Sequence, residues 1–176
     1  MSEGGPRIAV VGLGNVLMAD DGFGPYVVRV LEATYEFPSG VALLDAGTPG
    51  LDLVPFLEGL DALIVVDTVR ADGSPGTMHT YRREEILRHA AGPRTSPHDP
   101  GLKETLWTLE FVGRAPRDVL LVGVVPGPLV TDPHLSTAVR DAVPRAVESV
   151  VAELERLGVP APARTSPKSP GIWWEQ

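Results

Sequence analysis

Short runs of consecutive apolar residues recur along this chain, over residues 8–11, 41–44, 62–66 and 119–125. A strand that is apolar at every position is typical of a sheet buried on both faces. Segments with helical spacing lie between these runs, and the first such face carries Val27, Val30, Leu31 and Thr34. This alternation predicts an α/β fold, a three-layer sandwich in which helices cover both faces of a twisted, mostly parallel sheet.

A further strand is expected over 77–82, because a Gly73-Ser74-Pro75-Gly76 turn precedes it. It would bring the sheet to about five strands, and its direction decides whether the sheet is mixed. A helix is expected over 102–111, after the Pro100-Gly101 break. The last helix is predicted to begin at a Ser136 cap, to kink at Pro144 and to end at Gly158. Its apolar face carries Val139, Val143, Val147, Val150, Leu154 and Leu157.

The length and composition indicate one domain over 1–158 and a proline-rich tail over 159–176. The chain has 176 residues, 43% of them hydrophobic, which suffices for one full core but not for two domains of ordinary size. The tail holds four prolines and ends in Trp173-Trp174-Glu175-Gln176. Two interpretations of the tail stay open: a mobile or loosely packed segment, and a partner-binding segment anchored by its two tryptophans.

The charge balance argues against several classes of protein. Fifteen Lys and Arg against 23 Asp and Glu give a net charge of −8, which disfavours binding to nucleic acid or to an anionic membrane. Cysteine is absent, so disulfides, thiolate metal sites and a cysteine nucleophile are excluded. The sequence shows no apolar run of about 20 residues and no secretory signal over 1–6, so a cytoplasmic location is expected.

Three polar residues are predicted to meet where strands end. Asp21 follows the first strand, Asp67 closes the strand over 62–66, and His98 lies in the loop before the helix over 102–111. Ligands of open α/β sheets gather beyond the carboxyl ends of the strands. Two carboxylates and an imidazole suit a divalent ion such as nickel, zinc or manganese, and three protein ligands leave coordination positions open.

Each of these residues also has a plainer interpretation. Asp20 or Asp21 would serve as a helix cap, and Asp20 is the better candidate of the two. Asp67 follows a buried strand, so its carboxylate needs solvent, hydrogen bonds or a cation. His98 would be an ordinary surface histidine, as His79, His89 and His134 are expected to be surface or structural residues. Asp45 would support a ligand or form a turn.

The Gly12-Leu13-Gly14 loop argues against a dinucleotide site, although it lies between a strand and a helix. Leu17 stands where the fingerprint requires a third glycine. The acids Asp20 and Asp21 would also repel a pyrophosphate at the start of the helix.

An ordered set of motifs resembles the hydrogenase maturation endopeptidases over about residues 7–157. The set comprises Gly12-Leu13-Gly14-Asn15, Asp20-Asp21-Gly22-Phe23-Gly24, Asp45-Ala46-Gly47-Thr48-Pro49-Gly50, Val65-Val66-Asp67, Ser96-Pro97-His98 and Val122-Gly123-Val124. The resemblance implies a twisted sheet between helices. It also implies removal of a C-terminal extension from the large-subunit precursor of a nickel-iron hydrogenase, after nickel insertion.

The same resemblance implies roles for individual residues. Asp21, Asp67 and His98 match the residues that contact the metal, and Asp45 matches an acid suspected of substrate handling or cleavage. The nickel is expected to be supplied by the substrate, with no permanent ion in the enzyme. Either the metal or an aspartate such as Asp45 would activate the attacking water. One departure is Gly127, which stands where relatives often carry a glutamate after the proline.

The alternative from another class is a non-catalytic metal-binding or chaperone-like module. Such a module would inspect the hydrogenase precursor through the same ligands without cutting it, so product formation separates the two hypotheses.

Overall fold

In the described part of the chain, five strands form one mixed sheet. The computed structural model describes residues 5–47, 53–88 and 99–176. The strand order is β2-β1-β3-β5-β4, and all neighbouring pairs are parallel except β4 with β5. The strands are β1 (Ile8–Leu13), β2 (Val41–Gly47), β3 (Ala62–Thr68), β4 (Met78–Arg82) and β5 (Asp118–Val124). The predicted fold class is confirmed, and the antiparallel β4 makes the sheet mixed.

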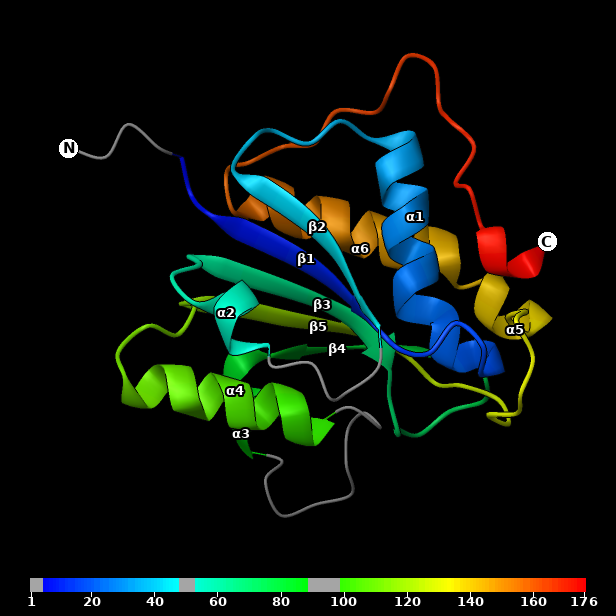
Figure 1. The fold of residues 1–176 in the computed structure, drawn as a ribbon, viewed down its shortest axis with the longest axis horizontal. Helices are drawn as coiled ribbons and strands as arrows, with labels where there is room; N and C mark the ends of the chain where they lie inside the picture. Colours follow the sequence, from blue (N-terminus) through cyan, green and yellow to red (C-terminus); the bar gives the residue numbers. More distant parts are fainter. Residues whose placement is uncertain (1–4, 48–52, 89–98) are drawn as a thin grey trace.

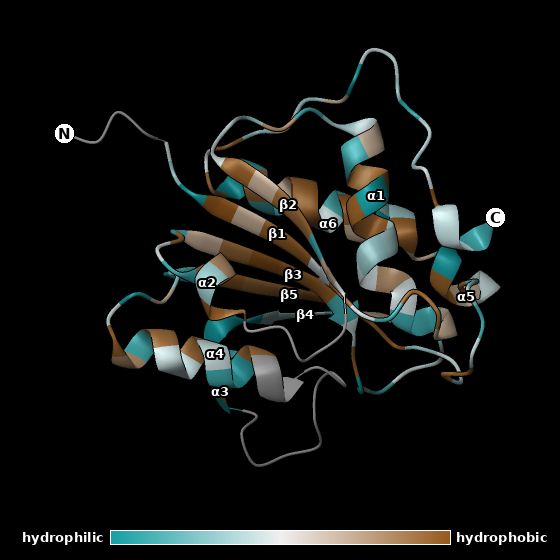
Figure 2. Ribbon diagram, in the orientation of Figure 1, coloured by the Kyte–Doolittle hydropathy of each residue, from teal (hydrophilic) through white to brown (hydrophobic). Residues whose placement is uncertain are grey.

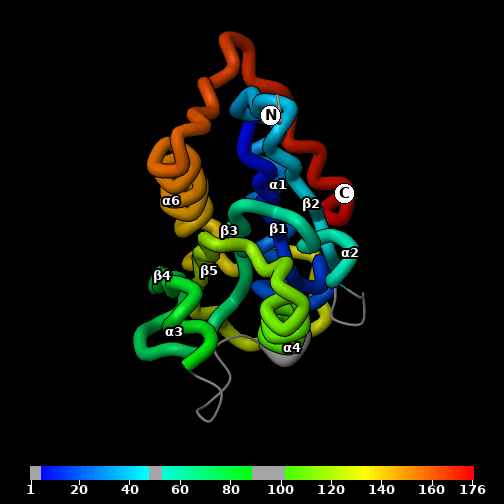
Figure 3. The backbone as a smooth tube through the Cα atoms, turned by 90° about the vertical axis from the view of Figure 1, so that its left-hand side faces the viewer, coloured from blue at the N-terminus to red at the C-terminus, as the bar shows by residue number. Residues whose placement is uncertain are grey.

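Helices cover both faces of this sheet, as Figures 1 and 3 show. One face carries α1 (Phe23–Thr34), α5 (Thr137–Arg140) and α6 (Val143–Arg156). The other carries α2 (Val54–Leu57), α3 (Arg83–Arg88) and α4 (Asp99–Phe111). The described residues also include two short 3-10 helices, η1 (Ala19–Gly22) and η3 (Trp173–Glu175).

The core consists of two apolar layers that the central strands separate. Along β1, Ile8 and Val10 face the layer under α1 and α6, whereas Ala9 and Val11 face the layer under α2 and α4. Strands β1 and β3 are buried at every position, and the central strands are hydrophobic along their length in Figure 2. Each large apolar side chain removed from water contributes about 1.5–3 kcal/mol, so burial on both faces fixes the strand register.

The last helical segment is two helices where the sequence predicted one kinked helix. Ser136 caps α5, as expected, by accepting a hydrogen bond from the Val139 backbone N–H. The helix then breaks, and Pro144 lies in the first turn of α6. Proline lacks the N–H that a helix interior needs, but the first turn leaves this group unbonded in any case. Pro144 therefore starts a second helix instead of bending the first.

The chain after Gly158 returns along α1. Backbone hydrogen bonds of 2.8 and 2.9 Å join Arg164 N to Thr34 O and Lys168 N to Ala33 O. At the end of the chain, Glu175 forms an ion pair of 2.7 Å with Arg140 of α5. Trp174 is buried and Trp173 is exposed. Of the two open interpretations, the structure therefore favours packing on the chain's own surface, with Trp173 left at the outside.

No helix in the described ranges is both long and apolar enough to cross a membrane.

Candidate functional site

The site begins in the loop that joins β1 to α1, at the edge where the parallel strands end. Gly14 has a φ of +133°, and a Cβ atom there would lie 1.8 Å from the Asp21 carbonyl oxygen. A Cβ on Gly24 would lie 2.3 Å from Leu13 O and 2.4 Å from Val66 O. These glycines let the loop fold tightly against β1 and β3, because no other residue fits such approaches. The glycine motif therefore positions Asp21.

Asp21 and Asp67 meet on either side of Thr68. An Asp21 carboxylate oxygen accepts from Asn15 N at 2.8 Å, and the other lies 3.5 Å from the Thr68 hydroxyl. The Asp67 carboxylate accepts from Thr68 N at 2.7 Å. All three side chains are buried. Burying carboxylates is costly unless donors or cations compensate them, so two of them beside the ends of β1 and β3 are typical of a binding site.

The structure describes two of the three predicted metal ligands. His98 lies outside the described residues, and the helix that follows it, α4, begins at Asp99. In Figure 1 the start of α4 lies toward the edge where the strands end. Within the described ranges, no group of three or more His, Asp and Glu side chains is placed to hold a metal ion. The three-ligand set therefore stays a prediction.

Asp20 holds two loops together, and its predicted role as a helix cap is wrong. The residue at the cap position of α1 is Gly22, and no side chain bonds there. The buried Asp20 carboxylate instead accepts from Gly127 N at 2.8 Å, Ser136 N at 2.6 Å and Ser136 Oγ at 2.9 Å. Gly127 and Ser136 belong to the segment after β5, so Asp20 ties this segment to the loop that carries Asp21.

Further backbone contacts join the same two segments. Ala19 N donates to Asp132 O at 2.6 Å, and Asp132 N donates to Leu17 O at 3.1 Å. Within this connection, Ala19 adopts a backbone φ of 47°, which is unfavourable for a residue with a Cβ. Sequence reasoning missed this connection because its partners lie more than 100 residues apart. The only signal in the sequence was the adjacent pair Asp20 and Asp21, of which one was expected to be a cap and the other a ligand.

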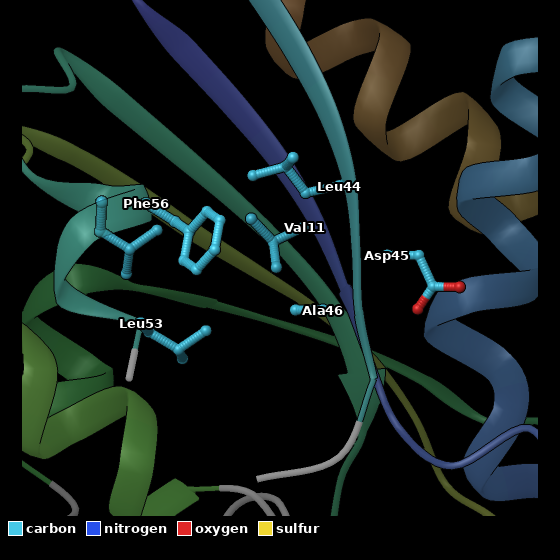
Figure 4. Close-up of a pocket in the computed structure, with 7 residues that line it drawn as sticks. Val11, Leu44, Asp45, Ala46, Leu53 and Phe56 are labelled. Atoms are coloured by element: carbon cyan, nitrogen blue, oxygen red, sulfur yellow. The ribbon is translucent and has the colours of Figure 1, made fainter. Parts of the chain in front are cut away.

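Asp45 is exposed and forms a turn at the end of β2. Its carboxylate accepts from Gly47 N at 3.1 Å, which matches the turn-forming interpretation. Figure 4 shows this carboxylate on the α1 side of β2, directed away from Leu53 and Phe56. The structure does not place Asp45 in contact with Asp21 or Asp67.

An apolar cavity of about 70 Å³ lies beside Asp45, on the α2 side of β1 and β2. It is lined by Val11, Leu44, Asp45, Ala46, Leu53, Phe56 and Leu57. Phe56 is 51% exposed at its rim. No local sequence pattern predicts this cavity, because residues from β1, β2 and α2 form it jointly.

Of the other histidines, His89 lies outside the described residues, and His79 and His134 bond to residues other than Asp21 and Asp67. His79 contacts Asp72 O at 2.8 Å and stacks on Tyr81, and His134 bonds to Asp132 at 2.8 Å. Both are exposed or half-buried, as predicted for surface or structural residues.

Comparison with known proteins gives one consistent family. The hydrogenase maturation protease family (HycI) matches residues 25–153. The hydrogenase expression/formation protein HupM of Azotobacter chroococcum mcd 1 is 42% identical over 73% of this chain, and the match spans 62% of that relative. The hydrogenase 2 maturation protease of Escherichia coli (strain K12) is 39% identical over 88% of this chain and 94% of its own.

A solved structure agrees with these sequence matches. The hydrogenase maturating endopeptidase HybD from E. coli superposes with a TM-score of 0.84 at 38% identity, covering 90% of this chain and 98% of that one. The fold and these matches thus place the chain among the α/β peptidases. More specifically, the chain belongs to the hydrogenase maturation proteases, and it is an endopeptidase with a role in hydrogenase maturation.

Proposed function

We propose that this protein removes the C-terminal extension of a nickel-iron hydrogenase large-subunit precursor, in the cytoplasm and after nickel insertion. Nickel already bound in the precursor is the signal for cleavage, and Asp21, Asp67 and His98 contact it. The observation that carries the proposal is the meeting of the buried Asp21 and Asp67 at Thr68, on the edge where the parallel strands end.

Shared coordination explains how the cleaved bond is selected. A metal ion held by both proteins places one segment of the precursor beside the enzyme's carboxylates, and this proximity replaces a chance encounter. The enzyme needs no permanent ion, since the substrate brings it. Without residues that contact the nickel, the enzyme could not distinguish a nickel-loaded precursor from a nickel-free one.

The chemical step is hydrolysis of a peptide bond. A base removes a proton from water, the water oxygen attacks the carbonyl carbon, and the C–N bond breaks as the amine takes a proton. Asp45 is a candidate for this base because its carboxylate is exposed. Its Gly47 bond and its orientation on the α1 side of β2 favour instead a role in shaping the turn.

The test mixes the purified protein with precursor in nickel-loaded and nickel-free forms, and follows precursor mass. Loss of a C-terminal peptide from the loaded form alone is expected. Cleavage of both forms would contradict the role of nickel, and loss of no peptide from either form would contradict the proposed protease function.

Matched variants test whether Asp21 and His98 act as ligands. Asp21→Asn and His98→Gln should stop cleavage of the loaded precursor while the domain stays folded. Asp118→Asn and His134→Gln are the controls, since Asp118 pairs with Arg156 at the opposite end of β5 and His134 bonds only within its own loop among described contacts. Retained cleavage in Asp21→Asn and His98→Gln would remove these ligands from the proposal.

The alternative of a non-catalytic module is disfavoured, because the family that the chain matches and its E. coli relatives are named as proteases or endopeptidases. It would bind the loaded precursor without any change of mass, so the first experiment also decides between the two.

A further inference from the structure

We propose that the apolar cavity beside β2 is a subsite for one aliphatic side chain of the precursor, two or three residues from the cleaved bond. The inference rests on the proposed function, because it takes the bond to be cut near Asp67. It adds a specificity determinant that is separate from the metal.

The register of the sheet fixes how far the cavity lies from Asp67. Val11, which lines the cavity, is opposite Val65 in the β1–β3 pair, and Asp67 lies two residues further along β3. Val65 packs in the apolar layer under α2 and α4, so strand alternation directs Asp67 to the same face. One strand spacing of about 4.8 Å and two residue rises of about 3.3 Å place the two about 8 Å apart.

This distance matches an extended peptide. Such a peptide advances about 3.3 Å per residue, so a side chain two or three residues from the cleaved bond reaches the cavity. The occupant is therefore a segment of the same substrate, already brought to this edge of the sheet by the site.

The lining determines the chemical class of that side chain. All lining residues except Asp45 are apolar, and Figure 4 shows the Asp45 carboxylate turned to the other side of β2. A cavity of about 150 Å³ holds benzene, whereas this one measures about 70 Å³. Its size suits a branched or linear aliphatic side chain better than an aromatic one. The exposed ring of Phe56 would cover such a side chain on one side.

The first experiment compares two equivalent substitutions on β2. Ala46→Leu fills the cavity, whereas Ala42→Leu makes the same change on the same strand face, at an exposed position outside the lining. We expect Ala46→Leu to lower kcat/KM for the loaded precursor about 10-fold or more, mainly through KM, because filling a subsite removes substrate binding. Ala42→Leu should cleave like wild type, and equal kcat/KM in the two variants would overturn the subsite.

A second enzyme variant guards against misfolding of the first. Phe56→Ala removes an exposed side chain from the rim and should raise KM several-fold. Phe111→Ala is its control, because Phe111 is 92% exposed on α4 and does not line the cavity. Unchanged KM in Phe56→Ala would count against the subsite even if Ala46→Leu were unstable.

Changes in the precursor identify the occupant. Aliphatic residues within three positions of the cleaved bond are replaced by alanine one at a time, and wild-type enzyme should lose about 10-fold in kcat/KM at one position. On the precursor substituted at that position, the Ala46→Leu enzyme should lose little further kcat/KM, since the effects of changing two residues in direct contact are not additive. Full additivity at every position would overturn the subsite. Failure of wild type to cut any loaded precursor would instead overturn the proposed function, and the subsite with it.

Discussion

Two buried acids in this molecule are held in opposite ways. Glu153 of α6 is 4% exposed and lies between Arg82 and Arg156, at 2.6 and 2.8 Å. Asp20 is 1% exposed at the carboxyl edge of the sheet, and its donors are two backbone N–H groups and the Ser136 hydroxyl. The arginines cancel the charge of Glu153. The donors to Asp20 orient and stabilise its carboxylate but bring no positive charge.

This difference distinguishes an acid that stabilises the fold, Glu153, from the acids of the candidate site. Burial alone raises the pKa of Glu153, but hydrogen bonds from Arg156 and Arg82 outweigh burial, so this pKa lies below its usual value. That ion-pair cluster joins β4 to α6 and needs no ligand to balance the charge of Glu153. Uncharged donors at Asp20 add no positive charge beside Asp21, which suits the proposed site, where the substrate would supply a cation.

The largest expected effect is on the cleavage rate, which should depend on an acid at the edge of the sheet and not on the acid of the ion-pair cluster. Asp67→Asn should lower the rate on loaded precursor by about 10²–10⁴-fold, because it removes a charge at the reacting site. Glu153→Gln should leave the rate per folded molecule unchanged. Timed mass spectrometry of the precursor measures both rates, and a comparable loss in the two variants would show that location does not separate the acids.

Removal of the Asp20 carboxylate should give the largest loss of stability. Asp20→Ala removes a buried charged acceptor from the partly buried donors of Gly127 and Ser136. Hydrogen bonds to charged groups contribute about 1.5–3 kcal/mol each, and water can replace part of the lost acceptor, so a loss of about 2–4 kcal/mol is expected overall. Urea unfolding measures it. Asp132→Asn is the control, since Asp132 is half-buried and its carboxylate bonds to His134 of its own segment instead of joining the two loops. An equal effect of the two substitutions would contradict the role of Asp20 in joining the loops.

Glu153→Gln should cost less, and its effect should depend on pH. We expect a loss of about 1–3 kcal/mol at pH 7, discounted because Arg82 and Arg156 can turn to solvent. The folded-state pKa lies below the unfolded one, so the carboxylate stabilises the fold above the usual glutamate pKa of about 4.3. This contribution disappears as the pH falls through the folded-state pKa.

The measurement is urea unfolding of wild type and Glu153→Gln at pH 7 and pH 3. The difference between the two should be large at pH 7 and small at pH 3. Glu148→Gln, an exposed position on α6, should show no such change. A difference that is constant with pH would show that the ion pairs do not stabilise the fold.

The smallest expected effect concerns Ala19, whose positive φ is maintained by the loop contacts. Ala19→Gly should change stability by less than about 1 kcal/mol, toward higher stability, because glycine adopts this conformation without strain. Ala152→Gly on the exposed side of α6 should instead destabilise by about 0.5–1 kcal/mol. Calorimetric midpoints distinguish the signs, and a destabilising Ala19→Gly would show that φ is not the limiting factor.

The sequence predicted those features that a local pattern specifies. The strands over 8–11 and 62–66 were apparent because burial on both faces requires an apolar residue at every position. The position of Asp21 and Asp67 at strand ends followed from the same pattern. The roles of Asp20 and of the cavity did not, because their partners come from distant segments, such as Ser136 for Asp20. The Pro144 break was only half predicted, since proline fits either a kink or a first turn.

The return of the tail along α1 gives this protein an optical reporter. Of its three tryptophans, Trp107 and Trp173 are 48% and 60% exposed, whereas Trp174 is 5% exposed. Emission at short wavelength should therefore come mainly from Trp174, at the last turn of the chain. A red shift of that component would register release of the tail while the sheet remains folded, and it would do so without any label.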